Sequence, residues 1–62
     1  MCRAEELQND LENLDFSRRY YIGVLAELKQ LGRTHTKEYR NIERGVQTIN
    51  NNIQRIEKEL AI

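Results

Sequence analysis

Apolar side chains recur along the chain at alternating spacings of three and four residues, the pattern of helices with one buried stripe. With heptad position a at residue 4 and position d at residue 7, the a and d positions of the first half hold Ala4, Leu7, Leu11, Leu14, Arg18, Tyr21, Leu25 and Leu28. In the second half they hold Tyr39, Ile42, Val46, Ile49, Ile53, Ile56 and Leu60. Charged or amide residues occupy most flanking positions, so the sequence predicts an all-α protein built from two amphipathic helices.

A break between the two helices is expected at residues 32–35. Gly32 directly follows a periodic segment, where glycine ends a helix because it enters the left-handed conformation freely, and the nearby threonines are good N-caps for a second helix. We therefore expect one domain spanning residues 1–62, with a first helix at about 3–31 and a second at about 36–61. The heptad count continues through the turn unshifted, so a single uninterrupted helix is the alternative. Against it, a helix-interior glycine costs about 1 kcal/mol relative to alanine.

The apolar stripe of the first helix widens along its length. Leu7, Leu11 and Leu14 form a narrow stripe that suits one neighbouring helix. From residue 20 onward the apolar side chains spread over about half the circumference, which suits two or more neighbours. The sequence thus predicts a helical hairpin in which a parallel dimeric coiled coil leads into a four-helix bundle. The expected core residues are Leu7, Leu11, Leu14, Arg18, Tyr21, Leu25, Leu28, Val46, Ile49, Ile53, Ile56 and Leu60.

Three polar or small features interrupt this pattern. Arg18 is the one charged residue among these a and d positions, and we expect its stem to pack while its guanidinium reaches an acid such as Asp15. Gly23 lies away from the seam, either as a tolerated helix glycine or as a point where the second helix or a bound peptide approaches closely. Residues 50–52, three consecutive asparagines, are expected on a solvated face.

Size and charge restrict the classes of partner. A chain of 62 residues seldom buries enough core to stand alone, so self-association into a homodimer or a higher oligomer is expected. Ten basic and ten acidic residues cancel, which argues against nucleic-acid binding, and the sequence has no apolar run of the length that spans a bilayer. Cys2 is the only cysteine, so no disulfide within one chain is available, and a reducing, cytoplasmic setting is expected.

The sequence offers little for catalysis. Ser17, Cys2 and His35 are the obvious reactive side chains, but they are spread along the chain without a supporting carboxylate at a meaningful spacing. No glycine-rich phosphate loop, paired-histidine metal motif or calcium loop occurs. We therefore expect neither an enzyme nor a cofactor or metal site.

The segment Tyr20-Tyr21-Ile22-Gly23-Val24-Leu25 follows a leucine-rich coil and precedes a turn about nine residues after its glycine. This arrangement resembles the aromatic-aromatic-apolar-Gly-x-Leu signature in the dimerisation domain of the end-binding family of microtubule plus-end tracking proteins. The resemblance covers about twenty residues. It implies a parallel coiled coil that enters a four-helix bundle, with an apolar cavity at the transition that captures short Ser-x-Ile-Pro peptides.

The resemblance implies a non-catalytic module for homodimerisation and partner recruitment, associated with the cytoskeleton. By the motif and the facing residues of the second helix, the expected partner-binding residues are Tyr20, Tyr21, Ile22, Leu25, Leu28, Tyr39 and Ile42. The sequence departs from the family in its longer second helix, in Lys29 at a usually acidic position, and in lacking the acidic tail and the microtubule-binding domain. It would therefore be a fragment that recruits partners but does not itself bind microtubules.

Two other functions fit the same pattern. One is a structural coiled-coil segment of a longer cytoskeletal or scaffold protein, in which the chain serves as a rod. The other is a small helical inhibitor or adaptor of the phage type that docks on a larger protein. Shape separates the rod from the hairpin, because a straight helix of this length would extend about 90 Å at 1.5 Å per residue.

Overall fold

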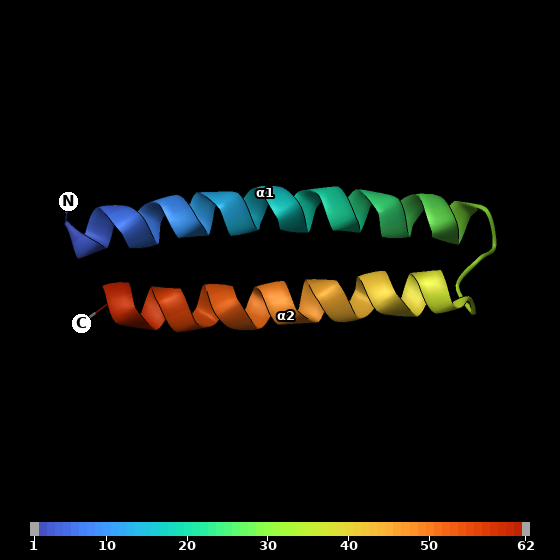
Figure 1. The fold of residues 1–62 in the computed structure, drawn as a ribbon. Coiled ribbons are helices and arrows are strands. Elements are labelled where there is room, and N and C mark those ends of the chain that lie inside the picture. Colours follow the sequence, from blue (N-terminus) through green and yellow to red (C-terminus); the bar gives the residue numbers. More distant parts are fainter. Residues whose placement is uncertain (1, 62) are drawn as a thin grey trace.

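Two antiparallel helices form a hairpin in the computed structural model, which describes residues 2–61. The first helix, α1, spans Arg3–Gln30, and the second, α2, spans Lys37–Leu60. They run side by side along nearly their whole lengths, with both ends of the chain at the same end of the molecule (Figure 1). The longest dimension is 45 Å, about half that of a straight helix. The predicted hairpin is confirmed, and the alternative of one continuous helix is wrong.

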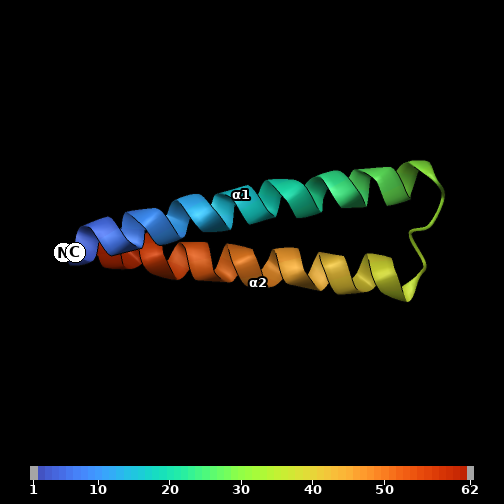
Figure 2. The same cartoon turned by 45° about the horizontal axis from the view of Figure 1, so that its top comes forward.

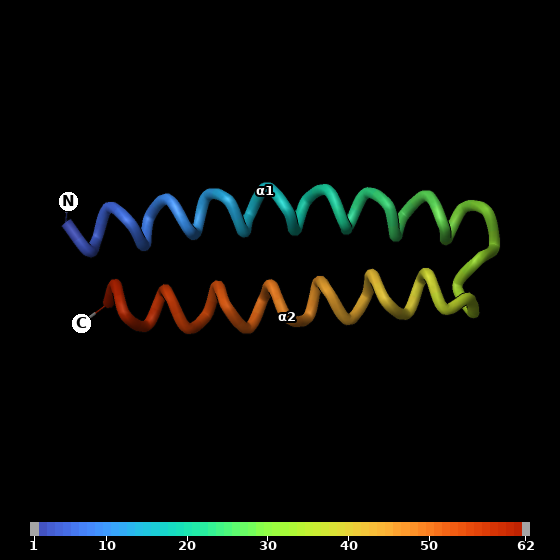
Figure 3. The backbone as a smooth tube through the Cα atoms, viewed as in Figure 1, coloured from blue at the N-terminus to red at the C-terminus, as the bar shows by residue number. Residues whose placement is uncertain are grey.

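The helix boundaries differ from the predicted ones by one residue. Leu31 and Thr36, which we placed inside the helices, are the C-cap of α1 and the N-cap of α2. Ala61 is the C-cap of α2. Met1 and Ile62, which the predicted domain includes, lie outside the described residues. The backbone trace makes the reversal between the helices easy to follow (Figure 3).

Gly32 ends α1 through a left-handed backbone conformation, with φ at 72°. The amide of Gly32 donates to the carbonyl of Lys29 at 3.1 Å, and the amide of Arg33 donates to the carbonyl of Leu28 at 2.8 Å. This pair of hydrogen bonds is the Schellman motif, which satisfies carbonyls that the end of a helix leaves without partners. The helix-ending role predicted for Gly32 is thereby confirmed.

Thr36 starts α2. Its Oγ1 accepts a hydrogen bond from the amide of Tyr39 at 3.1 Å and donates one to the carbonyl of Arg33 at 3.0 Å. The first bond satisfies a backbone N–H at the start of the helix, which is how an N-cap stabilises it. The second ties the cap to the turn, so the same side chain fixes both the start of α2 and the path of the preceding segment.

The core is a single layer of side chains between the two helices. Its buried members are Leu7, Leu28, Ile49, Ile53 and Ile56, all from the predicted list. Other predicted core residues are only half-buried in the single hairpin: Leu11, Leu14, Arg18, Leu25, Val46 and Leu60. Tyr21, also predicted as core, is exposed at its edge, with 36% of its surface accessible. Two helices alone leave much of the stripe only partly covered, because each helix has one neighbour.

The narrow leucine stripe of α1 packs against α2 of the same chain. Leu7 is 5% exposed, and the nearby Arg3 contacts Glu59 near the far end of α2 through Nη2 and Oε2 at 3.1 Å. The sequence pattern predicts instead that this stripe forms a parallel coiled coil between two chains, with the second helix folded back over the later part of the first. The difference arises because α2, with 24 residues, is nearly as long as α1, with 28, and reaches back to its start. A second view shows the two helices inclined to one another (Figure 2).

Candidate interaction surfaces

A polar cluster interrupts the apolar contact midway along the helices. Arg18 donates through Nη2 to Oδ1 of Asp15 at 2.6 Å and through Nη1 to Oδ1 of Asn50 on α2 at 3.3 Å. Arg19 also contacts Asp15, from Nη2 to Oδ2 at 3.1 Å. The expected pairing of Arg18 with Asp15 is confirmed. The solvated face predicted for residues 50–52 needs a correction: Asn51 is exposed, but Asn50 and Asn52 are half-buried, and Asn50 accepts a hydrogen bond beside the seam.

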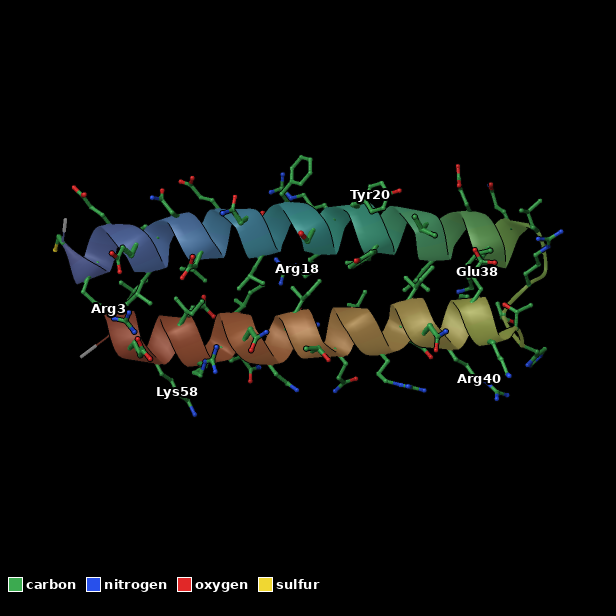
Figure 4. The ribbon with its side chains drawn as sticks, viewed as in Figure 1. Arg3, Arg18, Tyr20, Glu38, Arg40 and Lys58 are labelled. Carbon is green, nitrogen blue, oxygen red and sulfur yellow. The ribbon has the colours of Figure 1, made fainter. Side chains whose placement is uncertain are left out.

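Large apolar side chains of α1 and its C-cap remain exposed. Phe16 is 75% exposed, Leu31 67%, Tyr20 65% and Ile22 50%. Figure 4 shows Tyr20 pointing away from α2. Phe16 and Tyr20 are four residues apart and share one face of α1, and adjoining exposed aromatic side chains are typical of a surface that another molecule covers. Their arrangement explains the breadth of the stripe seen in the sequence, since α2 covers only one side of it.

The residues that we assigned to peptide binding do not meet in one groove of the single hairpin. Tyr20 and Ile22 are exposed, while Leu28 is buried in the core. The others lie near the contact between the helices: Tyr21 at its edge, and Leu25, Tyr39 and Ile42 half-buried. Successive helix residues are turned by about 100°, so Tyr20, Tyr21 and Ile22 project in three directions. A groove that used all of these residues would need a second chain.

Tyr21 packs across the hairpin onto a glycine that sequence reasoning missed. Its Cε2 atom lies 3.9 Å from the position of a Cβ built on Gly45. The ring of Tyr21 also meets that of Tyr20 edge-on, with centroids 5.8 Å apart. At Gly23, by contrast, no atom approaches such a Cβ within 4 Å. The close approach of the second helix considered for Gly23 is therefore not observed, and the glycine against which an aromatic side chain packs is Gly45.

Phe16 was also missed, although its spacing from Tyr20 could have revealed it. The two residues are four apart and share one face of α1, as helical periodicity requires. Because neither lies on the seam, the heptad pattern gave no reason to connect them.

The described residues contain no cluster of three or more histidine, cysteine, aspartate or glutamate side chains suited to holding a metal ion. Cys2 is exposed, and no helix within residues 2–61 is long and apolar enough to cross a membrane.

These observations define the molecule as an all-α helical hairpin with an exposed aromatic surface on α1, which consists of Phe16 and Tyr20. Comparisons of the sequence with protein families and curated proteins, and a search of solved structures, gave no match. The fold and its surfaces therefore carry the functional inference.

Proposed function

We propose that the protein is a non-catalytic assembly module in which two hairpins associate and the surface of α1 around Tyr20, Tyr21 and Ile22 recruits a further protein. The observation that carries this proposal is the contrast between a thin core and the large apolar side chains left outside it. The core holds five buried side chains among residues 2–61, each contributing about 1.5–3 kcal/mol. Chains of this size seldom reach useful stability without a partner, a disulfide or a metal.

A second hairpin would complete the partly covered seam. Leu11, Leu14, Leu25 and Val46 are half-buried along the contact between the helices. Packing two hairpins together gives each helix two neighbours, as in a four-helix bundle, and removes these side chains from water. This arrangement keeps the predicted bundle, but it joins hairpins whose α1 stripe is already covered by their own α2.

The resemblance to the end-binding family implies where the recruitment surface would lie. Tyr20 and Ile22 present apolar surface on either side of Tyr21, and two hairpins brought together could enclose the groove that one hairpin lacks. A Ser-x-Ile-Pro peptide is the ligand that the resemblance implies. Recruitment of this kind would place the protein in the cytoplasm beside the cytoskeleton.

Sedimentation equilibrium tests the association of two hairpins. At about 0.5 M salt, which screens contacts between surface charges, we expect the native protein to have twice the chain mass of 7.4 kDa. Val46→Glu introduces a charge at the half-buried seam and should shift the mass toward that of one chain. Gln54→Glu, which adds an equal charge at an exposed position of the same helix away from the seam, is the matched control and should leave the mass unchanged. Circular dichroism checks that both variants remain helical. A mass of one chain at every concentration would overturn the proposed dimer.

Calorimetry with a Ser-x-Ile-Pro peptide tests recruitment separately. We expect saturable binding to the native protein, loss of binding in Tyr21→Ala, and retained binding in Phe16→Ala, whose exposed ring lies outside the proposed groove. Ile22→Ala provides a second groove variant, since Ile22 is half-exposed and contributes little to the core. If the native protein releases no saturable heat with the peptide, the peptide-capture part of the proposal is wrong.

A small adaptor that acts as a single hairpin is the second candidate. It is favoured by the way α2 covers α1 along its full length, since Arg3 at the start of α1 contacts Glu59 near the end of α2. In this function the exposed aromatic surface would dock directly on a larger protein. The sedimentation experiment separates the two, because the adaptor remains one chain when no partner is present.

A further inference from the structure

The side of α2 that faces away from α1 is a line of basic residues. We define the outer face of α2 by its exposed residues Lys37, Arg40, Arg44, Gln47, Asn51, Arg55 and Lys58. Their spacings of three, four and seven place them on one side of the helix, and Figure 4 shows Arg40 and Lys58 pointing away from α1. None of the five cations forms an ion pair with an acidic group of residues 2–61. This face therefore has a positive charge that the single hairpin leaves unmatched.

The opposite side of the molecule has the complementary character. We define the outer face of α1 by its exposed residues Glu5, Asn9, Glu12, Phe16, Tyr20, Gly23 and Glu27. Three carboxylates are distributed along it, with the two aromatic rings at its centre. The nearest cation, Arg19, is already bonded to Asp15 at 3.1 Å. The hairpin thus has an acidic and aromatic outer face on one helix and a basic outer face on the other.

The contacts within the hairpin show which residues of these faces lie at the same level. Arg3 meets Glu59 at one end, and Tyr21 lies against Gly45 farther along. Counting from these contacts along the antiparallel helices, Glu27 lies level with Arg40. By the same counting, Glu5 lies near the level of Lys58, and Glu12 near that of Arg55. A second hairpin placed alongside in the same orientation keeps these levels, so its acids face these cations.

We propose that the outer face of α2 binds the outer face of α1 of a second copy, so that hairpins stack side by side. Each exposed charge pair contributes only about 0.2–1 kcal/mol, so several must act together. At the centre of the contact, Phe16 and Tyr20 would cover Asn51 and Gln47. Arg44 would lie beside Gly23, where nothing obstructs it within 4 Å, and within reach of the Tyr20 ring.

This stacking goes beyond the proposed pairing of hairpins because it uses different side chains. The two contacting faces are not the same patch, so the contact is heterologous, and a stack keeps one free face at each end. Because each copy is related to the next by a translation, the stack does not close into a ring and can keep adding copies. The stack should therefore lengthen as protein concentration rises and shorten as salt screens the charges, with a screening length of about 10 Å at 0.1 M.

Charge reversal at one matched pair tests the proposal. We would measure the weight-average mass of the native protein by sedimentation over a roughly hundredfold range of concentration, at about 0.02 M and about 0.5 M salt. We expect the mass at low salt to rise beyond two chains. Glu27→Arg and Arg40→Glu should each weaken this growth about three- to tenfold, and the double variant should restore most of it.

Two substitutions outside the outer face of α1 provide matched controls. Asp10→Arg and Lys29→Glu make the same charge changes at exposed positions of α1 outside its outer face and should leave the growth unchanged. Circular dichroism verifies folding. The stacking proposal is wrong if the native mass at low salt does not rise beyond two chains at any concentration. It is equally wrong if the double variant stacks no better than the single ones. In that case the basic outer face of α2 would bind an acidic partner other than a second copy of this chain. A stable mass of two chains in either case would leave the proposed pairing intact.

Discussion

Two glycines that look alike in the sequence have opposite roles in the structure. Gly32 adopts a left-handed backbone with φ at 72°, where a side chain is strained. Gly23 has ordinary helical backbone, and nothing lies within 4 Å of a Cβ built there. The first glycine is therefore required by the turn, while the second only weakens α1, because it adds backbone entropy to the unfolded chain.

Alanine at each position should show this difference. Gly32→Ala is expected to lower the free energy of unfolding by about 1 kcal/mol, since alanine must enter the left-handed region. Gly23→Ala is expected to raise it by about 0.5–1 kcal/mol through helix propensity. Urea denaturation followed by circular dichroism measures both. Changes of the same sign would contradict the assignment of a distinct conformation to Gly32.

The helices differ in how closely the apolar stripe matches the surface that is covered. In α2 the buried residues are Ile49, Ile53 and Ile56, all of them seam isoleucines, so its pattern and its packing agree. In α1 the apolar side chains extend beyond the seam to Phe16, Tyr20 and Ile22, which remain exposed. An apolar residue of α1 is therefore a poor guide to the core unless its position on the helix is considered.

Truncation of an isoleucine on each helix tests this contrast. Ile53, which is 9% exposed, should cost about 2–5 kcal/mol when changed to alanine, because a cavity remains between the helices. Ile22→Ala removes the same atoms from a side chain that is 50% exposed and should cost well under 1 kcal/mol. Thermal and urea denaturation at matched concentration compare them. Similar losses at both positions would show that Ile22 is covered in solution.

What could be predicted from the sequence depends on how far apart the interacting residues are along the chain. The turn at Gly32 and the pairing of Arg18 with Asp15 involve near neighbours, and both are confirmed. The contacts of Tyr21 with Gly45 and of Arg18 with Asn50 depend on the alignment of two antiparallel helices. A heptad pattern that continues unshifted through the turn does not contain that alignment.

At the scale of the molecule, chain reversal brings the two ends together. The ion pair of Arg3 with Glu59, at 3.1 Å, lies at the end of the hairpin opposite the turn. The same end-to-end proximity is visible in Figure 1. This geometry also explains why the predicted transition from a two-chain coil to a bundle is absent from the single chain: α2 occupies the whole length of α1.

Distances between spin labels test the reversal in solution. A label on Cys2, paired with one on Lys58→Cys, should report a short distance, far below the ~85 Å that a straight helix would place between them. The control pair, Cys2 with Gln30→Cys, lies within α1 and should report about 42 Å in either case. Dilution with unlabelled protein removes distances between chains. A long distance for the first pair would contradict the hairpin.

The closeness of the two ends of the hairpin, where Arg3 contacts Glu59, has a practical consequence for protein engineering. Because the ends lie side by side, the hairpin can be spliced into a surface loop of a host protein without forcing the host's flanking strands or helices apart. The inserted hairpin would extend outward from the host surface, with the Gly32 turn at its far end and its two charged outer faces exposed on opposite sides.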